Sequence, residues 1–170
     1  LTLFLGLPLA LATKPQSCAP LIPVTFDNTT VPQILGQWFY IVGASRYPPH
    51  LPEIRAVKFA AFSFSPSSHE DELNVTEIMR MNETCVVRNS TVQVFQQNST
   101  LMHVVGNEGN FTARLIQSDK DLLILDHINI DFPSLSLSAR TPNVSKEHME
   151  EFKAHLHCLG FTEEDVFYTS

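Results

Sequence analysis

Eight short segments, each suited to a β-strand, recur at near-regular spacing along the chain and limit its possible folds more than any other feature. Between them lie residues that favour turns, such as the stretches at 98–100 and 106–109. The predicted strands cover residues 37–45, 57–65, 74–81, 86–95, 100–105, 110–117, 122–128 and 135–139. Regularly spaced short strands joined by tight turns predict an antiparallel sandwich or barrel.

The segment after the eighth strand has a helical pattern instead. Ser145 is a suitable N-cap, and Gly160 is a stop signal. Between them, apolar residues recur three or four positions apart, at Met149, Phe152, Leu156 and Leu159. We therefore expect an amphipathic helix over 145–159, followed by a short final strand at 165–168.

Both ends of the chain suggest a piece of a secreted precursor. Residues 1–12 form an uncharged apolar run that is too short to span a bilayer and ends in a small-x-small pattern. We interpret this run as a partial signal peptide and residues 13–170 as one domain with a truncated C-terminus. No other apolar run approaches membrane length, and the net charge of −7 argues against nucleic-acid binding.

N-glycosylation sequons are far more frequent than chance would give. Seven of the nine asparagines begin an Asn-x-Ser/Thr triplet, where composition predicts about one or two. The predicted glycosylation sites are Asn28, Asn74, Asn82, Asn89, Asn98, Asn110 and Asn143. Each should lie on the surface, because a glycan cannot be buried. The sequons independently predict passage through the secretory pathway.

The cysteine count is odd, which is unusual for an oxidising compartment. Cys18, Cys85 and Cys158 are the three cysteines. One of them could be free or pair between chains. Alternatively, a fourth cysteine beyond residue 170 would restore an even number.

Three motifs resemble those of the lipocalin family. Gly36 and Trp38 form a Gly-x-Trp at the start of the first strand, and 118–121 falls where the family has its second motif, a turn between late strands. Arg140 lies after the eighth strand, where the family has an arginine that packs over the tryptophan. The resemblance implies an all-β fold: an eight-stranded antiparallel up-and-down barrel with one C-terminal α-helix and a short final strand. Gly36, Trp38 and Arg140 would form its floor, with a cation–π contact worth about 1–2 kcal/mol when desolvated.

Within the lipocalins, the chain resembles the orosomucoid group over essentially all of its mature length. Segments that carry this resemblance include 18–24, 33–41, 62–66 and 165–169. The group has two disulfides. The resemblance implies that Cys18 pairs with Cys158 and that Cys85 pairs with a cysteine beyond the chain end. Closing a loop of over 100 residues would contribute about 4–5 kcal/mol in the chain-entropy model.

Alternate side chains of each strand should face the interior. Val42 is expected to share this inner face with Trp38 and Tyr40. The residues predicted to contact a ligand are Trp38, Tyr40, Phe62, Phe64, Glu77, Met79, His103, Leu125 and Ser136. A mostly apolar wall with a few polar groups is typical of small-molecule pockets. Affinity would come from burial of apolar ligand surface, at about 25 cal/mol per Å², and Glu77 would favour a basic amine.

Three of the inner positions depart from the group's usual pattern. His103 stands where an arginine is typical, Met79 where a glutamine is common, and Ser138 where a tyrosine is usual. These residues suggest a roomier pocket with fewer hydrogen bonds and less affinity for acidic ligands. His103 either titrates near neutral pH and releases ligand on acidification, or is a packed histidine without that role.

The resemblance implies a secreted plasma carrier of small lipophilic or basic molecules, acute-phase and immunomodulatory. An alternative is an immune interaction protein that works through its glycans or its surface and has no physiological cavity ligand. Catalysis is not expected, because Cys18 and Cys158 lie outside the predicted barrel and Cys85 is expected to end its third strand. We also expect no cofactor, no metal, no transmembrane segment and a monomer.

Overall fold

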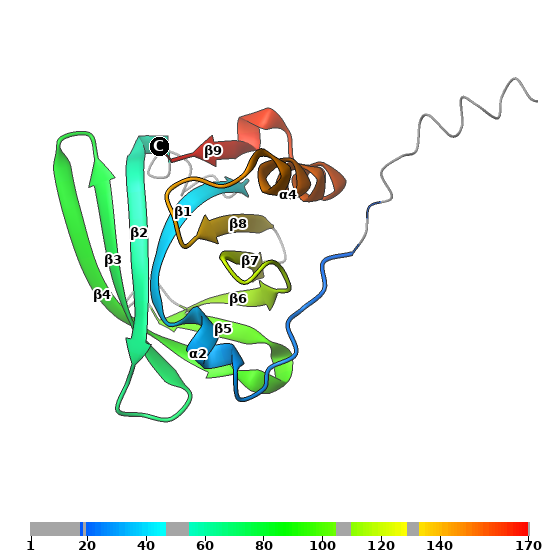
Figure 1. Cartoon of the computed structure of the whole chain (residues 1–170). Coiled ribbons are helices and arrows are strands. Elements are labelled where there is room, and N and C mark those ends of the chain that lie inside the picture. Colours follow the sequence, from blue (N-terminus) through cyan, green and yellow to red (C-terminus); the bar gives the residue numbers. More distant parts are fainter. Residues whose placement is uncertain (1–17, 19, 47–54, 105–109, 129–132, 170) are drawn as a thin grey trace, which may run out of the picture.

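The alternating segments form a single antiparallel sheet, closed into a barrel, as the computed structural model of the chain shows (Figure 1). The structure describes residues 18, 20–46, 55–104, 110–128 and 133–169, so the predicted signal peptide at 1–12 lies outside the described part. The strands are β1 Gly36–Ser45, β2 Val57–Pro66, β3 Glu72–Met81, β4 Thr84–Phe95, β5 Thr100–Val104, β6 Asn110–Ile116, β7 Leu122–Ile128, β8 Ser134–Ala139 and β9 Val166–Tyr168. The helices are α2 Thr30–Ile34 and α4 Lys146–Cys158, with short 3-10 turns η2 Gln96–Asn98 and η4 Glu163–Asp165.

Each strand from β1 to β8 pairs with its neighbours in chain order, and β1 also pairs with β8, which closes the ring. The β1–β2 contact is short, running from Gly36 opposite Phe64 to Phe39 opposite Ala61. Beyond it, β9 pairs with β1 through residues 42–44, outside the ring. The predicted lipocalin architecture is therefore confirmed, including the C-terminal helix and the final strand. The short helix α2 was not expected.

A bulge in β1 overturns one prediction about its inner face. Tyr40 lies opposite Ser138 of β8, but Val42 lies opposite Leu137, so the register shifts by one residue between them. The extra residue reverses the alternation. Val42 therefore packs in the core between the barrel wall and α4, fully buried, instead of facing the interior with Tyr40.

The prediction that Cys85 ends the third strand is also wrong. Strand β4 begins at Thr84, and Cys85 is its second residue, exposed and opposite Arg80 of β3. The turn between β3 and β4 is tighter than predicted because Asn82 adopts a left-handed conformation with φ of +56°. Asparagine tolerates this conformation better than most residues do.

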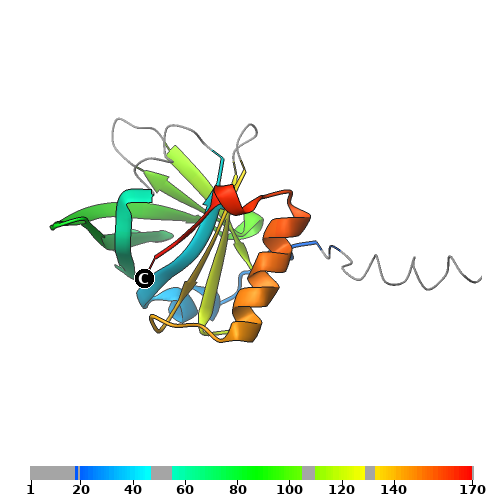
Figure 2. The ribbon, with the colours of Figure 1, turned by 90° about the horizontal axis from the view of Figure 1, so that it is seen from above.

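Helix α4 covers the outer wall of the barrel (Figure 2). Ser145 caps it, accepting a hydrogen bond from the backbone N–H of His148. Phe152 and Leu156 are buried against apolar residues of the wall. Those residues are Ile41, Val42, Ala44, Ile116, Ile124, Leu135, Leu137 and Ala139. A disulfide between Cys18 and Cys158 ties the N-terminal segment to the end of this helix.

The helix core generates a stability prediction. Phe152 is 1 % exposed, so Phe152→Ala should remove a filled volume and lower the free energy of unfolding by about 3–5 kcal/mol. Leu159, at the end of the same helix, is 44 % exposed, and Leu159→Ala should cost less than about 1 kcal/mol. Urea unfolding followed by circular dichroism measures both. Equal losses would contradict the assignment of Phe152 to the core.

Candidate functional site

The candidate site is the barrel interior, and its closed end is built around Trp38. The indole Nε1 donates a hydrogen bond to the Ile34 carbonyl at the end of α2, at 2.9 Å. The Arg140 guanidinium lies 3.7 Å from the centre of a Trp38 ring. Its Nη1 and Nη2 donate to the carbonyls of Gln37, at 2.9 Å, and Gln33, at 2.7 Å. The indole and the guanidinium thus provide donors for α2 carbonyls that have no partner within so short a helix.

Two features of the closed end explain why position 36 is a glycine. Its φ is +94°, in the region that disfavours any side chain. A Cβ at this position would also lie 3.3 Å from Nη1 of Arg140. The Gly-x-Trp spacing therefore places the indole inside while it leaves room for the arginine outside.

Above Trp38 the interior is filled with apolar side chains. Trp38 is 1 % exposed and Phe64 is 5 % exposed, and both belong to one buried cluster. The cluster also contains Ile34, Leu73, Val75, Val92, Val94, Leu101, Leu115 and Leu123. Phe62 and Leu125 are only partly buried and pack against it. Trp38 and Phe64 therefore form the buried base of the interior, and Phe62 and Leu125 lie at the margin of this cluster.

Polar side chains form a track along the inner wall from β3 to β8. Phe62 lies opposite Glu77, which lies opposite Arg88 of β4. Ser90 of β4 is hydrogen-bonded through Oγ to Nε2 of His103, at 2.6 Å. The next residues of this track come from β7 and β8, where His127 Nε2 is 3.3 Å from Ser136 Oγ.

Burial keeps the two histidines of this track neutral at physiological pH. Burial lowers the pKa of His103, although the negative charge of Glu77 opposes the shift. Burial lowers the pKa of His127 to about 4, with a further contribution from His103. The lowered pKa of His103 favours the packed, neutral histidine of the two alternatives, because loss of solvent outweighs the nearby carboxylate.

Tyr40 occupies the β1 side of the interior, and its position depends on a glycine. A Cβ on Gly43 would collide with the Tyr40 hydroxyl, so a side chain at position 43 would displace that ring. The Tyr40 ring stacks on Phe167 of β9, with ring centres 6.1 Å apart. Burial raises the pKa of Tyr40, which keeps its hydroxyl protonated.

Five residues of this wall were missing from the predicted ligand set: Gly43, Arg88, Ser90, His127 and Phe167. An isolated glycine within a strand pattern was a usable signal for Gly43. His127 shares the alternation of Leu125 and could have been added on that ground. Phe167 could not have been found, because its place depends on β9 pairing with β1. Among the predicted residues, Met79 is 9 % exposed and lies opposite Ala60 of β2.

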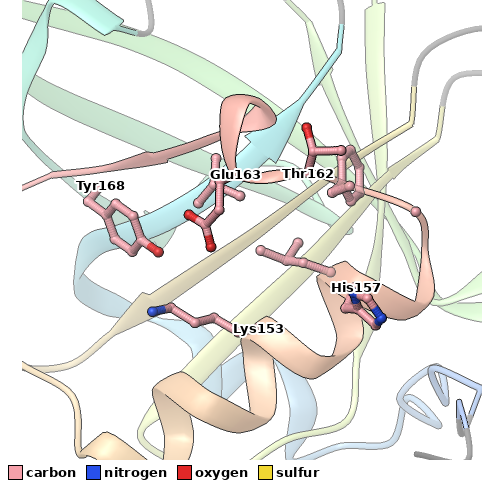
Figure 3. Close-up of a pocket in the computed structure, with 9 residues that line it drawn as sticks. Lys153, His157, Thr162, Glu163 and Tyr168 are labelled. Atoms are coloured by element: carbon pink, nitrogen blue, oxygen red, sulfur yellow. The ribbon is translucent and has the colours of Figure 1, made fainter. Parts of the chain in front are cut away.

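Two hollows formed by described residues lie elsewhere. One, of about 370 Å³, lies between α4 and β9, over the buried side chains of Leu156 and Phe161. Figure 3 shows Lys153 reaching from α4 toward Tyr168 of β9, and its Nζ lies 5.5 Å from the centre of that ring. The other, of about 740 Å³, lies at the turn between β3 and β4. Neither is lined by the polar track.

The described residues contain no group of three or more histidine, cysteine, aspartate or glutamate side chains placed to hold a metal ion. Within the same residues, no helix has both the length and the apolar character needed to cross a membrane.

Comparison with known proteins matches this architecture to one family. Residues 4–167 match the ApoM domain family model. The chain is 31 % identical to alpha-1-acid glycoprotein of Bos taurus over 166 residues, which is 96 % of this chain and 82 % of that protein. It is 30 % identical to the protein of the same name from Oryctolagus cuniculus over 165 residues, with the same coverage. The chain belongs to the lipocalin family, in its alpha-1-acid glycoprotein (orosomucoid) group.

A solved lipocalin supports the fold. The siderocalin Ex-FABP superposes with a TM-score of 0.66 over 81 % of this chain and 93 % of its own, at 19 % identity. The predicted family motifs of the lipocalin barrel can now be located. The turn at 118–121 joins β6 to β7, and its Asp121 carbonyl accepts a hydrogen bond from the backbone N–H of Arg140 at 3.0 Å. The second motif and the third thus meet at the closed end.

The sequon asparagines whose side chains the structure describes lie on the outside of this lipocalin. All those whose side chains are described are exposed: Asn28, Asn74, Asn82, Asn89, Asn98 and Asn143. Asn110 is the first residue of β6 and pairs with Val104. The exposure is compatible with glycosylation at six of the predicted sites.

The closed end generates a prediction about Arg140. Arg140→Lys keeps the charge but loses the paired donors and the planar stacking on Trp38. It should lower the free energy of unfolding by about 1–3 kcal/mol and alter the Trp38 emission spectrum. Arg114→Lys is the control, because Arg114 forms a surface ion pair with Asp126 at 3.7 Å, worth less than about 1 kcal/mol. If both variants behave like the wild type in urea unfolding, the role assigned to Arg140 is wrong.

The interior histidines generate a pH prediction. The pKa of His127 is about 4 in the folded chain and 6.5 for an unperturbed histidine, so between these values the unfolded chain takes up a proton that the folded chain does not. His127 therefore does not lower the free energy of unfolding above pH 6.5. As the pH falls from 6.5 toward 4, it lowers that free energy by at most about 1.4 kcal/mol per pH unit. His127→Gln should flatten that part of the stability–pH curve. Urea midpoints measured from about pH 7.5 to about pH 4.5 test it, with the exposed His69→Gln as control. A slope unchanged by His127→Gln would refute the prediction.

Proposed function

We propose that the protein is a secreted carrier that binds small lipophilic or amphipathic molecules, often basic ones, in the interior of its barrel. The observation that carries the proposal is the sparse track of polar side chains on an otherwise apolar inner wall, above a sealed floor. Such a wall buries apolar ligand surface for affinity and uses a few polar groups for orientation. Membership of the lipocalin family supports a small-molecule carrier.

The interior assigns distinct roles to its residues. Phe62 and Leu125 would contact the apolar body of the ligand, since they are the partly buried residues above the core. Tyr40, His103 and Ser136 would provide hydrogen bonds. Neutral histidines donate and accept, so they can orient a ligand without requiring that it carry a charge.

Glu77 would select for a basic amine, and Arg88 would oppose that selection. The two residues lie opposite one another on β3 and β4, so the wall presents both signs of charge. Arg88 supplies a positive charge at a position where none was predicted, which reduces the expected loss of affinity for acidic groups. Met79 and Phe64 would act indirectly, through the packing of the wall.

Several finer features belong to the same proposal. Exposed sequons and the Cys18–Cys158 disulfide favour an extracellular protein, and the relatives' group suggests plasma as its location. Acute-phase and immunomodulatory roles are carried over from the resemblance alone. Ex-FABP is described as functioning through dual ligand specificities, and a barrel with both charges on its wall could likewise accept more than one ligand class. We also propose that the protein is monomeric.

Catalysis is not proposed, because Cys85 of β4 faces outward and Cys18 and Cys158 are joined in a disulfide. A free thiolate inside the barrel, which nucleophilic catalysis by cysteine would need, is therefore not available among these cysteines. The second candidate function, an immune interaction protein acting through glycans or surface, is favoured by the six exposed sequons. Calorimetric titration with steroids, basic amines and fatty acids, together with Trp38 fluorescence, separates the two. If the folded protein binds none of these ligands, the carrier proposal is wrong.

Glu77 and Arg88 should have opposite effects on the affinity for a basic ligand. Glu77→Gln should weaken binding of a lipophilic amine by about tenfold, or about 1.4 kcal/mol, and leave a neutral steroid unaffected. Arg88→Gln should strengthen binding of the same amine. Glu72→Gln is the control, because Glu72 lies on the other face of β3 and accepts a hydrogen bond from Ser67 at 2.6 Å. Equal effects of Glu77→Gln on amine and steroid would contradict the assigned role.

A further inference from the structure

The outer face of the β3–β4 ribbon combines apolar side chains with sequons in an ordered series. Because Val75 is part of the interior core, the residues on either side of it in β3 point outward. Four outward pairs follow one another toward the turn: Asn74–Thr91, Thr76–Asn89, Ile78–Val87 and Arg80–Cys85. Asn82 occupies the turn beyond the last pair.

The third of these pairs is apolar and open to solvent. Val87 is 60 % exposed and Ile78 is 39 % exposed, and both are β-branched residues suited to strand–strand contact. Exposed apolar side chains favour association between copies of a chain where they stand beside an unpaired strand edge.

The strand that carries Val87 also has an open edge beside this pair. Strand β4 pairs with β5 only from Thr91 to Phe95, so within the described residues its first part, 84–87, pairs with β3 alone. Figures 1 and 2 show this part of the ribbon projecting away from the rest of the barrel. An exposed edge presents backbone N–H and C=O groups that can pair with another chain.

Sequons flank the apolar pair on both sides. Asn89 is in the adjacent pair, about 7 Å along the ribbon at the usual strand rise, and Asn82 is in the turn on the other side. Both are exposed, and Asn89 Oδ1 accepts a hydrogen bond from the Thr76 hydroxyl at 3.1 Å, which orients its amide on the outer face. A glycan is bulky and solubilising, so glycans at these positions would extend over the apolar pair and along the edge.

We propose that N-linked glycans on Asn82 and Asn89 shield the Ile78–Val87 pair and the 84–87 edge of β4 from association with a second copy of this chain. The proposal rests on passage through the secretory pathway, which is part of the proposed function, but it does not depend on ligand binding. It assigns these two sequons a task that the sequons at Asn28 and Asn143 do not share, since Asn28 precedes α2 and Asn143 lies between β8 and α4, outside strands β3 and β4.

The test compares two double variants of the full-length secreted protein. Asn82→Asp with Asn89→Asp removes the shield, while aspartate keeps the tolerance for a left-handed backbone at 82 and the acceptor for Thr76 at 89. Asn28→Asp with Asn143→Asp removes the same number of sequons elsewhere and adds the same charge. Light scattering after concentration should rise about tenfold faster for the first variant and stay within about twofold of wild type for the second.

A third variant identifies the surface responsible. Ile78→Thr with Val87→Thr, introduced into the Asn82→Asp, Asn89→Asp background, keeps β-branched residues but makes the pair polar. It should return the aggregation rate to that of the wild type. Enzymatic removal of glycans from the folded wild-type protein should reproduce the fast rate, which shows that the effect does not arise from misfolding during secretion.

Each of several results would overturn the proposal. Glycopeptide mass spectrometry could show both asparagines unmodified in the secreted protein, or the two double variants could aggregate equally fast. Aggregates that dissolve on reduction would implicate Cys85 instead. Ligand titration is performed on the same samples. Faster aggregation with intact ligand binding would show loss of the glycan shield, whereas loss of ligand binding would count against the carrier proposal.

Discussion

The contact between Arg140 and Trp38 holds the closed end of the barrel together. The guanidinium lies over the indole and donates to carbonyls of α2 and β1, while the backbone of the same residue donates to the β6–β7 turn. The short β1–β2 contact that closes the ring begins at the residue before Gln37. A single side chain thus joins the first strand, the short helix before it and the end of the last barrel strand. Gly36 makes the arrangement possible, because a Cβ there would press against the guanidinium.

A one-residue bulge divides the molecule into two cores. Before it, Trp38 and Tyr40 face the interior; after it, Val42 and Ala44 face α4. The same strand therefore contributes to the ligand wall at one end and to the helix core at the other. The reversal also brings Gly43 to the inner face, where it leaves room for the Tyr40 hydroxyl. The upper part of the interior is consequently shaped by the bulge in β1 as much as by the side chains around it.

The inner and outer faces of the barrel differ in polarity, and each contains a few side chains of the opposite character. The interior is apolar with a few paired polar groups, and it keeps His103 and His127 neutral through burial. The outer face of β3 and β4 is polar with one apolar pair, and sequons stand on either side of that pair. The apolar side chains of the interior are removed from water by folding alone. On the outer face of β3 and β4, folding leaves the apolar pair in water. Added carbohydrate would therefore matter on that face and not on the wall that α4 covers.

Local patterns in the chain were enough to predict the strand order, the helix and the residues of the floor. Alternation, turn residues and the spacing of Met149, Phe152 and Leu156 are local signals, and Gly36 and Trp38 stand at positions that a family pattern marks. The folded molecule was needed to establish which side of the sheet buries Val42, where Cys85 lies, and that Phe167 packs on Tyr40. These outcomes depend on a bulge, a tight turn and a pairing between β1 and β9. The bulge and the β1–β9 pairing arise from contacts between strands far apart in the chain, for which alternation along one strand carries no information.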